Sequence, residues 1–144
     1  MNTTKVSLDL SNRSQHTDLG IELWLDQCKF FDHVIGPGSH HVVHEFKAQD
    51  GPHALHMVLK NKLATHTQID DQGHIISDAL INVNNIKLDD IDITQIVHQL
   101  GQYIHDTNGQ NTMAVHRFYG DMGCNGKVEL NFTVPIYIWL LENM

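Results

Sequence analysis

Alternation of apolar and polar residues is the dominant pattern along this chain. It runs through the ranges 5–10, 21–26, 41–46 and 53–60, and further β patterns follow in 75–84 and 127–132. Successive side chains of a strand point to opposite faces, so such alternation is typical of strands that bury one face. In 53–60, for example, it predicts Leu55, Met57 and Leu59 on one face, with His56, Val58 and Lys60 on the other.

Turn-forming residues separate these segments. They cluster at 36–38, 49–52, 70–73, 108–111 and 125–126. Asn125-Gly126 is the strongest two-residue hairpin signal, because both residue types tolerate a positive φ, and it predicts a hairpin that ends in the strand 127–132. About eight or nine short strands between such turns predict an all-β fold, an antiparallel β-sandwich or jelly roll.

One internal segment, 94–101, has helical spacing. Thr94 can cap this helix and Gly101 can end it. The apolar positions that share one helical face are Ile96, Val97 and Leu100. One or two helical turns are therefore expected here.

Composition narrows the class of protein. The chain has 144 residues, enough for one domain over 1–144, with 41% hydrophobic residues and a net charge of −8. That charge repels phosphates, so neither nucleic acid nor an anionic membrane is an expected partner. The longest apolar run, 134–141, is too short to span a bilayer. The start of the chain lacks the apolar core of a signal peptide, so no export signal is expected.

The chain contains twelve histidines. Five of them gather on two strands that we expect to be neighbours: His40, His41, His44, His53 and His56. Imidazoles at this density can bind Zn²⁺ or Ni²⁺, and such a site needs His44 with His56, or His41 with His53, across the strands. The alternative is that these histidines face solvent.

Acidic residues form two groups beside turns. The first contains Asp70, Asp71 and Asp78, and the second contains Asp89, Asp90 and Asp92. Carboxylates and turn carbonyls suit Ca²⁺, although the spacing is not that of an EF-hand loop. The alternative is ordinary turn chemistry on a solvated face. Apart from Ca²⁺, no cofactor is expected.

No catalytic motif is present. The sequence has no Gly-x-Ser-x-Gly, no phosphate-binding loop and no His-Glu-x-x-His. The sequence does contain the neighbours His105-Asp106 and His116-Arg117. In a chain with so many histidines, such pairs occur by chance and are weak evidence for a catalytic site. We therefore expect no catalytic residue and no enzyme activity.

The C-terminal segment 133–144 is apolar on all sides. It suits a strand or a short helix, and Thr133 as cap with Pro135 in the first turn favours the helix. A segment of this kind must be buried, either in its own core or against a partner. The candidate interface residues are Pro135, Ile136, Tyr137, Ile138, Trp139, Leu140 and Leu141, with Trp139 or Tyr137 as the expected anchor.

Two resemblances add to this reading. The order of three segments is similar to the strand order of Ca²⁺-dependent xylan-binding modules. These segments are Glu22-Leu23-Trp24-Leu25-Asp26, Asp50-Gly51-Pro52-His53 and the strand in 81–91. This likeness covers about residues 20–92 and implies a glycan-binding module that uses Ca²⁺.

The whole chain also resembles small structural proteins encoded by tailed phages, especially marine ones. The segments that carry this likeness are 59–62, 105–109, 118–126 and the ending 135–144. The resemblance implies a virion component, such as a capsid decoration, head-fibre or tail protein. The expected function is therefore assembly with other virion proteins or with further copies of this chain, and the alternative is a Ca²⁺-dependent carbohydrate-binding module.

Overall fold

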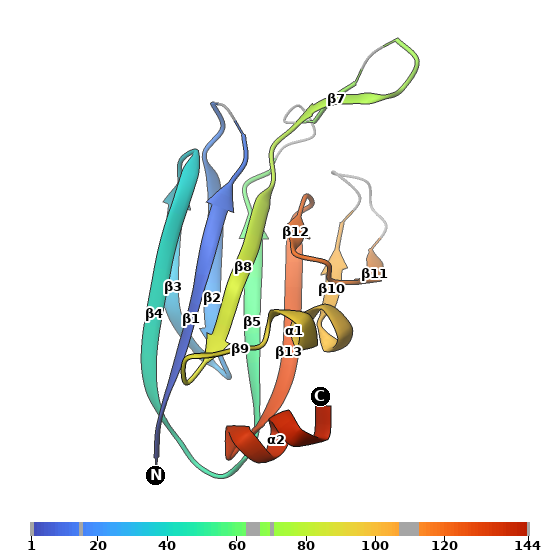
Figure 1. Ribbon diagram of the computed structural model, residues 1–144. Coiled ribbons are helices and arrows are strands. Elements are labelled where there is room, and N and C mark those ends of the chain that lie inside the picture. The colour runs from blue at the N-terminus through green and yellow to red at the C-terminus, as the bar shows by residue number, and fades with distance from the viewer. Residues whose placement is uncertain (1, 15, 63–66, 70, 107–112, 144) are drawn as a thin grey trace.

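Two antiparallel sheets pack face to face in the computed structural model (Figure 1), which describes residues 2–14, 16–62, 67–69, 71–106 and 113–143. The first sheet, sheet A, runs in the order β4, β1, β8, β12, and β9 pairs with β8. Its strands are β1 (Asn2–Asn12), β4 (Gly38–Ala48), β8 (Ile81–Leu88), β9 (Ile91–Asp92) and β12 (Asp121–Met122).

The second sheet, sheet B, is wider and runs in the order β11, β10, β13, β5, β2, β3. Its strands are β2 (Leu19–Leu25), β3 (Cys28–Ile35), β5 (Gly51–Lys60), β10 (Gln102–His105), β11 (Ala114–Arg117) and β13 (Gly126–Val134). A short pair, β6 (Thr67–Ile69) and β7 (Ile75–Asp78), extends beyond the sandwich. The prediction of an all-β antiparallel sandwich is confirmed.

The core lies between the sheets, where alternate residues of each strand point inward. Leu55, Met57 and Leu59 of β5 are buried, as the alternation predicts, and His56 on the other face is half-buried. The largest fully buried side chains include Phe118, Leu8, Leu10, Leu23 and Met57. Burial of these apolar surfaces is the main force that holds the two sheets together.

Two helices complete the sandwich. α1 (Thr94–Leu100) buries Ile96 and Val97 and lies over the part of sheet B that sheet A leaves open (Figure 1). Leu100 remains exposed. Thr94 is the first helical residue rather than the cap, because the cap position is taken by Ile93. α2 (Ile136–Asn143) crosses the lower end of the sandwich next to β13, so the helical interpretation of the C-terminal segment is confirmed.

The hairpin predicted at Asn125-Gly126 is wrong. The strand before it, β12, pairs with β8 in sheet A, whereas the strand after it, β13, pairs with β5 and β10 in sheet B. Gly126 serves a steric purpose instead, because a Cβ there would lie 2.3 Å from the carbonyl oxygen of Ile104. The sequence pattern also did not single out β3, most of whose residues are exposed or half-buried.

A tight turn occurs at Asp89-Asp90. These residues connect β8 to β9 with φ values of 50° and 67°, and Leu88 pairs with Ile91 across the turn. Aspartate is one of the few residue types that adopts positive φ readily. Aspartates at these two positions therefore suit the backbone of the turn.

Candidate functional site

The C-terminal helix α2 has one side in the core. Ile136, Trp139 and Leu140 are only 4–6% exposed. The Trp139 ring meets Phe132 of β13 edge to face, with centroids 6.1 Å apart. Ile136, Trp139 and Leu140 therefore complete the core of this chain, and the expectation of Trp139 as an interface anchor is wrong.

The other side of α2 is apolar and faces solvent. Tyr137 is 66% exposed, Ile138 48% and Leu141 77%, while Pro135 at the start of the helix is half-buried. A helix two turns long that presents three large apolar side chains to water is unusual unless a partner covers them. Of the seven predicted interface residues, Tyr137, Ile138 and Leu141 are thus the ones available for contact.

A groove separates α2 from α1. It has a volume of about 330 Å³, with Ile91, Ile96 and Leu140 among its apolar lining residues. Side-chain amides line it as well, from Gln95, Gln99 and Asn143. The Asn143 amide donates to the Trp139 carbonyl at 2.8 Å, which fastens the end of α2. The groove between the two helices is therefore a recess of mixed apolar and amide character, to which α2 contributes Leu140 and Asn143.

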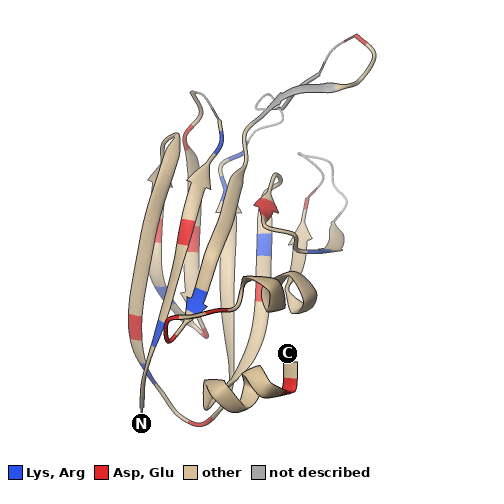
Figure 2. Cartoon of the chain, in the orientation of Figure 1, with Lys and Arg blue, Asp and Glu red and all other residues tan. Residues whose placement is uncertain are grey.

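The carboxylates proposed for Ca²⁺ are separated by the fold. Asp71 lies in the turn between β6 and β7, whereas Asp89 and Asp90 lie at the opposite end of β8 (Figure 1). Asp70 and the side chain of Asp78 lie outside the described residues. Figure 2 shows acidic residues spread over strands and turns of both sheets. Among the described residues, no group of three or more His, Cys, Asp or Glu side chains is placed to hold a metal ion.

The second acidic group has partners within the chain. Asp89 Oδ1 accepts from the Lys5 backbone N–H at 2.8 Å, and Asp90 Oδ1 lies 2.7 Å from Lys5 Nζ. The hydrogen bond to Asp90 raises the pKa of Lys5 above its ordinary value. The backbone N–H of Thr94 lowers the pKa of Asp92. These contacts belong to a turn and to the segment before α1, so Asp89 and Asp90, which we expected as calcium ligands, have partners within the chain.

The proposed histidine pairs are also separated. Strands β4 and β5 were expected to be neighbours, but the chain crosses from sheet A to sheet B between them. His44 points inward from β4 and stacks on Phe30 with centroids 4.4 Å apart, whereas His56 lies on the outer face of β5, 3.8 Å from Glu129. The pairing of His44 with His56 is therefore wrong.

The second pair fails for the same reason. His41 Nδ1 lies 2.5 Å from Asp9 Oδ1 in sheet A, and His53 Nδ1 lies 2.8 Å from Asp26 Oδ2 in sheet B. Each of these histidines contacts a carboxylate on a neighbouring strand or turn instead of another imidazole.

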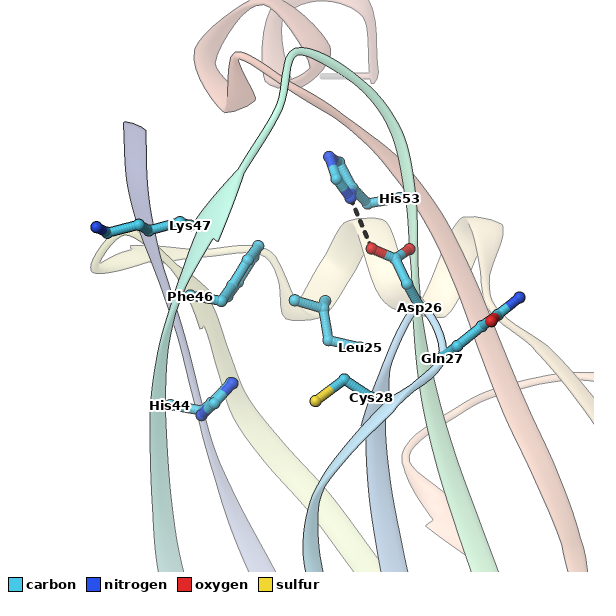
Figure 3. Close-up of a pocket in the computed structure, with 8 residues that line it drawn as sticks. All are labelled: Leu25, Asp26, Gln27, Cys28, His44, Phe46, Lys47 and His53. Atoms are coloured by element: carbon cyan, nitrogen blue, oxygen red, sulfur yellow. Dashed lines mark hydrogen bonds and ion pairs between the residues drawn. The ribbon is translucent and has the colours of Figure 1, made fainter. Parts of the chain in front are cut away.

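A second cavity lies between the β2–β3 turn and β4, with a volume of about 470 Å³ (Figure 3). Leu25 and Phe46 supply apolar surface, and the Cys28 thiol and the His44 ring point into the same space. The remaining lining residues are Asp26, Gln27, Lys47 and His53. Sequence reasoning did not find this cavity, because its residues come from two sheets that meet only in the folded chain.

The Asp26–His53 pair forms one wall of that cavity. Asp26 has a φ of 53° at the start of the turn, and its Oδ1 accepts from the Ala54 backbone N–H at 2.9 Å. His53 also bonds the Gln49 carbonyl through Nε2 at 2.7 Å. Burial lowers the pKa of His53, but the hydrogen bonds to Asp26 and Gln49 outweigh it, so the pKa is raised above 6.5.

The outer face of sheet B carries a network of charges. Lys60 Nζ contacts Glu22 and Asp32, and Lys29 contacts Asp32. The hydrogen bonds from Lys60 and Lys29 lower the pKa of Asp32 to about 2. Lys29 Nζ also lies 5.5 Å from the centre of the Trp24 ring. The ring of Trp24 is therefore already engaged by a cation of its own sheet.

No family model matches this chain, and comparisons with curated proteins and with solved structures found no match. None of the helices in the described part of the chain has both the length and the apolar character needed to cross a membrane.

Proposed function

We propose that this chain is a structural protein of a phage virion, without enzyme activity, which binds a neighbouring protein subunit through the outward side of α2. The observation that carries this proposal is the exposure of Tyr137, Ile138 and Leu141 on a helix whose other side is fixed in the core. The phage setting is supported by the resemblance of the segments 118–126 and 135–144.

The physical basis is burial of apolar surface on a rigid support. Ile136, Trp139 and Leu140 anchor α2, so little conformational entropy is lost when a partner covers the opposite side. Tyr137 is the aromatic residue among the three exposed ones, and tyrosine is enriched among residues that dominate interface energetics. We expect Tyr137 and Leu141 to fill apolar recesses of the partner.

The experiment is incorporation into particles. Phage that encodes this chain is grown with a tagged copy, the virions are purified on a density gradient, and the tagged chain is quantified against the major capsid protein. We expect the unmodified chain to co-purify in a constant ratio. Leu141→Asp should be lost from particles, because a charge replaces a buried apolar contact.

A matched control separates assembly from folding. Val115→Asp on β11 changes a side chain of comparable exposure, 63%, far from α2. We expect it to be incorporated like the unmodified chain. Absence of the unmodified chain from purified virions, or equal incorporation of Leu141→Asp, would contradict the proposal. Deletion of 135–144 is a poorer test, because it also removes core side chains.

Glycan binding is the second candidate function, and the cavity beside Phe46 favours it. A sugar ring has both apolar faces and hydroxyl groups, which suits the combination of Phe46, Asp26 and Gln27. The exposed sheet face is less suitable, since Lys29 covers the ring of Trp24. Calorimetric titration with xylan and other polysaccharides, with and without EDTA, tests this candidate. Heat of binding that EDTA abolishes would favour the Ca²⁺-dependent module.

A further inference from the structure

One edge of sheet A is long and bare. β4 pairs with β1 at all eleven of its positions, from Gly38 to Ala48, and no described strand pairs with its other side. Figure 1 shows this strand at the outer edge of its sheet. An edge of this length offers a row of backbone N–H and C=O groups, and natural sheets usually shorten or block such edges. β4 contains no proline, and its sole lysine, Lys47, lies next to its end.

We propose that β4 pairs antiparallel with the β4 of a second copy of this chain, around a two-fold axis at Val43. The pairing joins the two copies of sheet A into one continuous sheet. This surface differs from α2, so the inference does not rest on the proposed function.

The alternation along β4 limits the register. Ser39, His41, Val43, Glu45 and Lys47 are all exposed, while the residues between them are buried or half-buried. Opposed residues of an antiparallel pair point to the same face, so exposed residues must oppose exposed residues. Relative to the register in which Val43 opposes Val43, a shift of the partner strand by an odd number of positions is excluded. Such a shift would turn the core face of one copy toward solvent.

Charge favours an axis at Val43 over the neighbouring axis at His44. With the axis at Val43, each His41 lies opposite a Glu45, and the two Val43 side chains meet. With the axis at His44, His41 would lie opposite Lys47 and Val43 opposite Glu45, so two basic side chains meet and the carboxylate of Glu45 faces an apolar side chain. Opposite charges across a strand pair stabilise it, and like charges destabilise it.

The favoured register also continues a charge pattern already present within each copy. In β1, Lys5 lies opposite Glu45 and Asp9 lies opposite His41. Asp9 is bound to His41 at 2.5 Å, and the hydrogen bonds from Asn85 and His41 lower its pKa. In the dimer, one row of side chains crosses four neighbouring strands. Its order is Lys5 and Glu45 from one copy, followed by His41 and Asp9 from the second copy. Glu45 then lies between Lys5 of its own copy and His41 of the second copy, while Asp9 ends the row beside His41 and Asn84. This row occurs twice around the axis.

The oligomeric state of the full chain tests the inference. Sedimentation velocity should give a species with twice the mass of one chain. Val43→Lys should convert it to a monomer, because two ammonium groups would meet at the axis. The matched control is Val115→Lys on β11, where a similarly exposed valine lies outside the proposed interface. A monomeric unmodified chain would overturn the inference, as would a dimer that Val43→Lys leaves intact.

A cross-link provides a second readout that does not depend on loss of binding. In a Cys28→Ser background, which removes the exposed native thiol, Val43→Cys places two cysteines opposite each other at the axis. We expect rapid oxidation to a covalent dimer. Val34→Cys on β3, which is also well exposed, should remain monomeric on a denaturing gel. Equal cross-linking at positions 34 and 43 would show random collision and contradict the register.

Discussion

Gly126 lies where β10 approaches the start of β13. A Cβ at this position would lie 2.3 Å from the Ile104 carbonyl oxygen and 2.5 Å from the His105 Cα. Both of these are backbone atoms, which cannot move aside without distorting the sheet. The absence of a side chain therefore allows the two strands to pair.

Gly126→Ala should lower the free energy of unfolding by about 1–3 kcal/mol, the usual range for overpacking a tight site. Urea unfolding followed by circular dichroism measures the change. Gly36→Ala is the control, because its Cβ would meet only the end of the Asp18 side chain at 3.2 Å. A loss at Gly126 no larger than that at Gly36 would show that β10 can move away.

His53 connects the start of β5 to the β2–β3 turn through Asp26. Because its folded pKa is raised, the folded chain binds the imidazole proton more tightly than the unfolded chain does. The stabilisation is fully present below the unfolded pKa of about 6.5 and is lost as the pH rises through the folded pKa. The charged His53–Asp26 pair therefore contributes most under mildly acidic conditions.

We predict that His53→Gln lowers stability more at about pH 6 than at about pH 8.5, because the charged imidazole donates to both Asp26 and the Gln49 carbonyl, whereas the neutral ring has one proton to donate. Unfolding free energies of both chains at several pH values provide the comparison. Asp26→Asn should weaken the same dependence while keeping the positive φ, since asparagine also adopts it. A difference that stays constant or grows with pH would be inconsistent with the raised pKa.

At the scale of elements, α2 divides its apolar residues between two tasks. Its inward side closes the lower end of the sandwich, and its outward side faces solvent, where the proposed function places a partner. The two sides alternate along the helix so closely that neighbouring residues differ completely in burial. Leu140 is 6% exposed and Leu141 is 77% exposed.

These two leucines form a matched pair for mutation. Leu140→Ala should cost about 2–5 kcal/mol of stability, because it leaves a cavity in the core. Leu141→Ala should change stability by no more than about 0.5 kcal/mol, as is usual for surface positions. Thermal or urea unfolding of both variants checks the assignment of sides. Equal losses would mean that α2 packs in a different orientation.

At the scale of the whole molecule, the sandwich has central and peripheral strands. β5 and β13 lie inside sheet B and are paired on both sides, and β1 has the same position in sheet A. β3 and β11 form the edges of sheet B. Stability against local opening should follow this order, since central strands open only when neighbours are lost on both sides.

Amide hydrogen exchange should therefore be slowest in β1, β5 and β13 and faster in β3 and β11. Mass spectrometry of peptides after timed exchange gives the rates. β4 is informative, because an unpaired edge exchanges fast and a dimer across it should slow exchange at high protein concentration. Faster exchange in β5 than in β11 would contradict the strand order.

The type of fold and most of the strands could be predicted from the sequence. Alternation within a strand is a local property, so Leu55, Met57 and Leu59 could be assigned to a buried face without knowledge of their neighbours. The short helix at 94–101 and the apolar C-terminal segment could be predicted for the same reason, because their patterns are also local. The tail also pointed to the candidate contact surface.

The tertiary structure alone decided which strands are neighbours. The placement of β4 and β5 in different sheets separated His44 from His56, and the placement of β12 and β13 removed the hairpin at Asn125-Gly126. It also decided which side of α2 is buried, because every residue in 136–141 is apolar and the sequence cannot distinguish them. Strand pairing and burial depend on contacts between residues far apart in the chain, and a local pattern carries no information about those contacts.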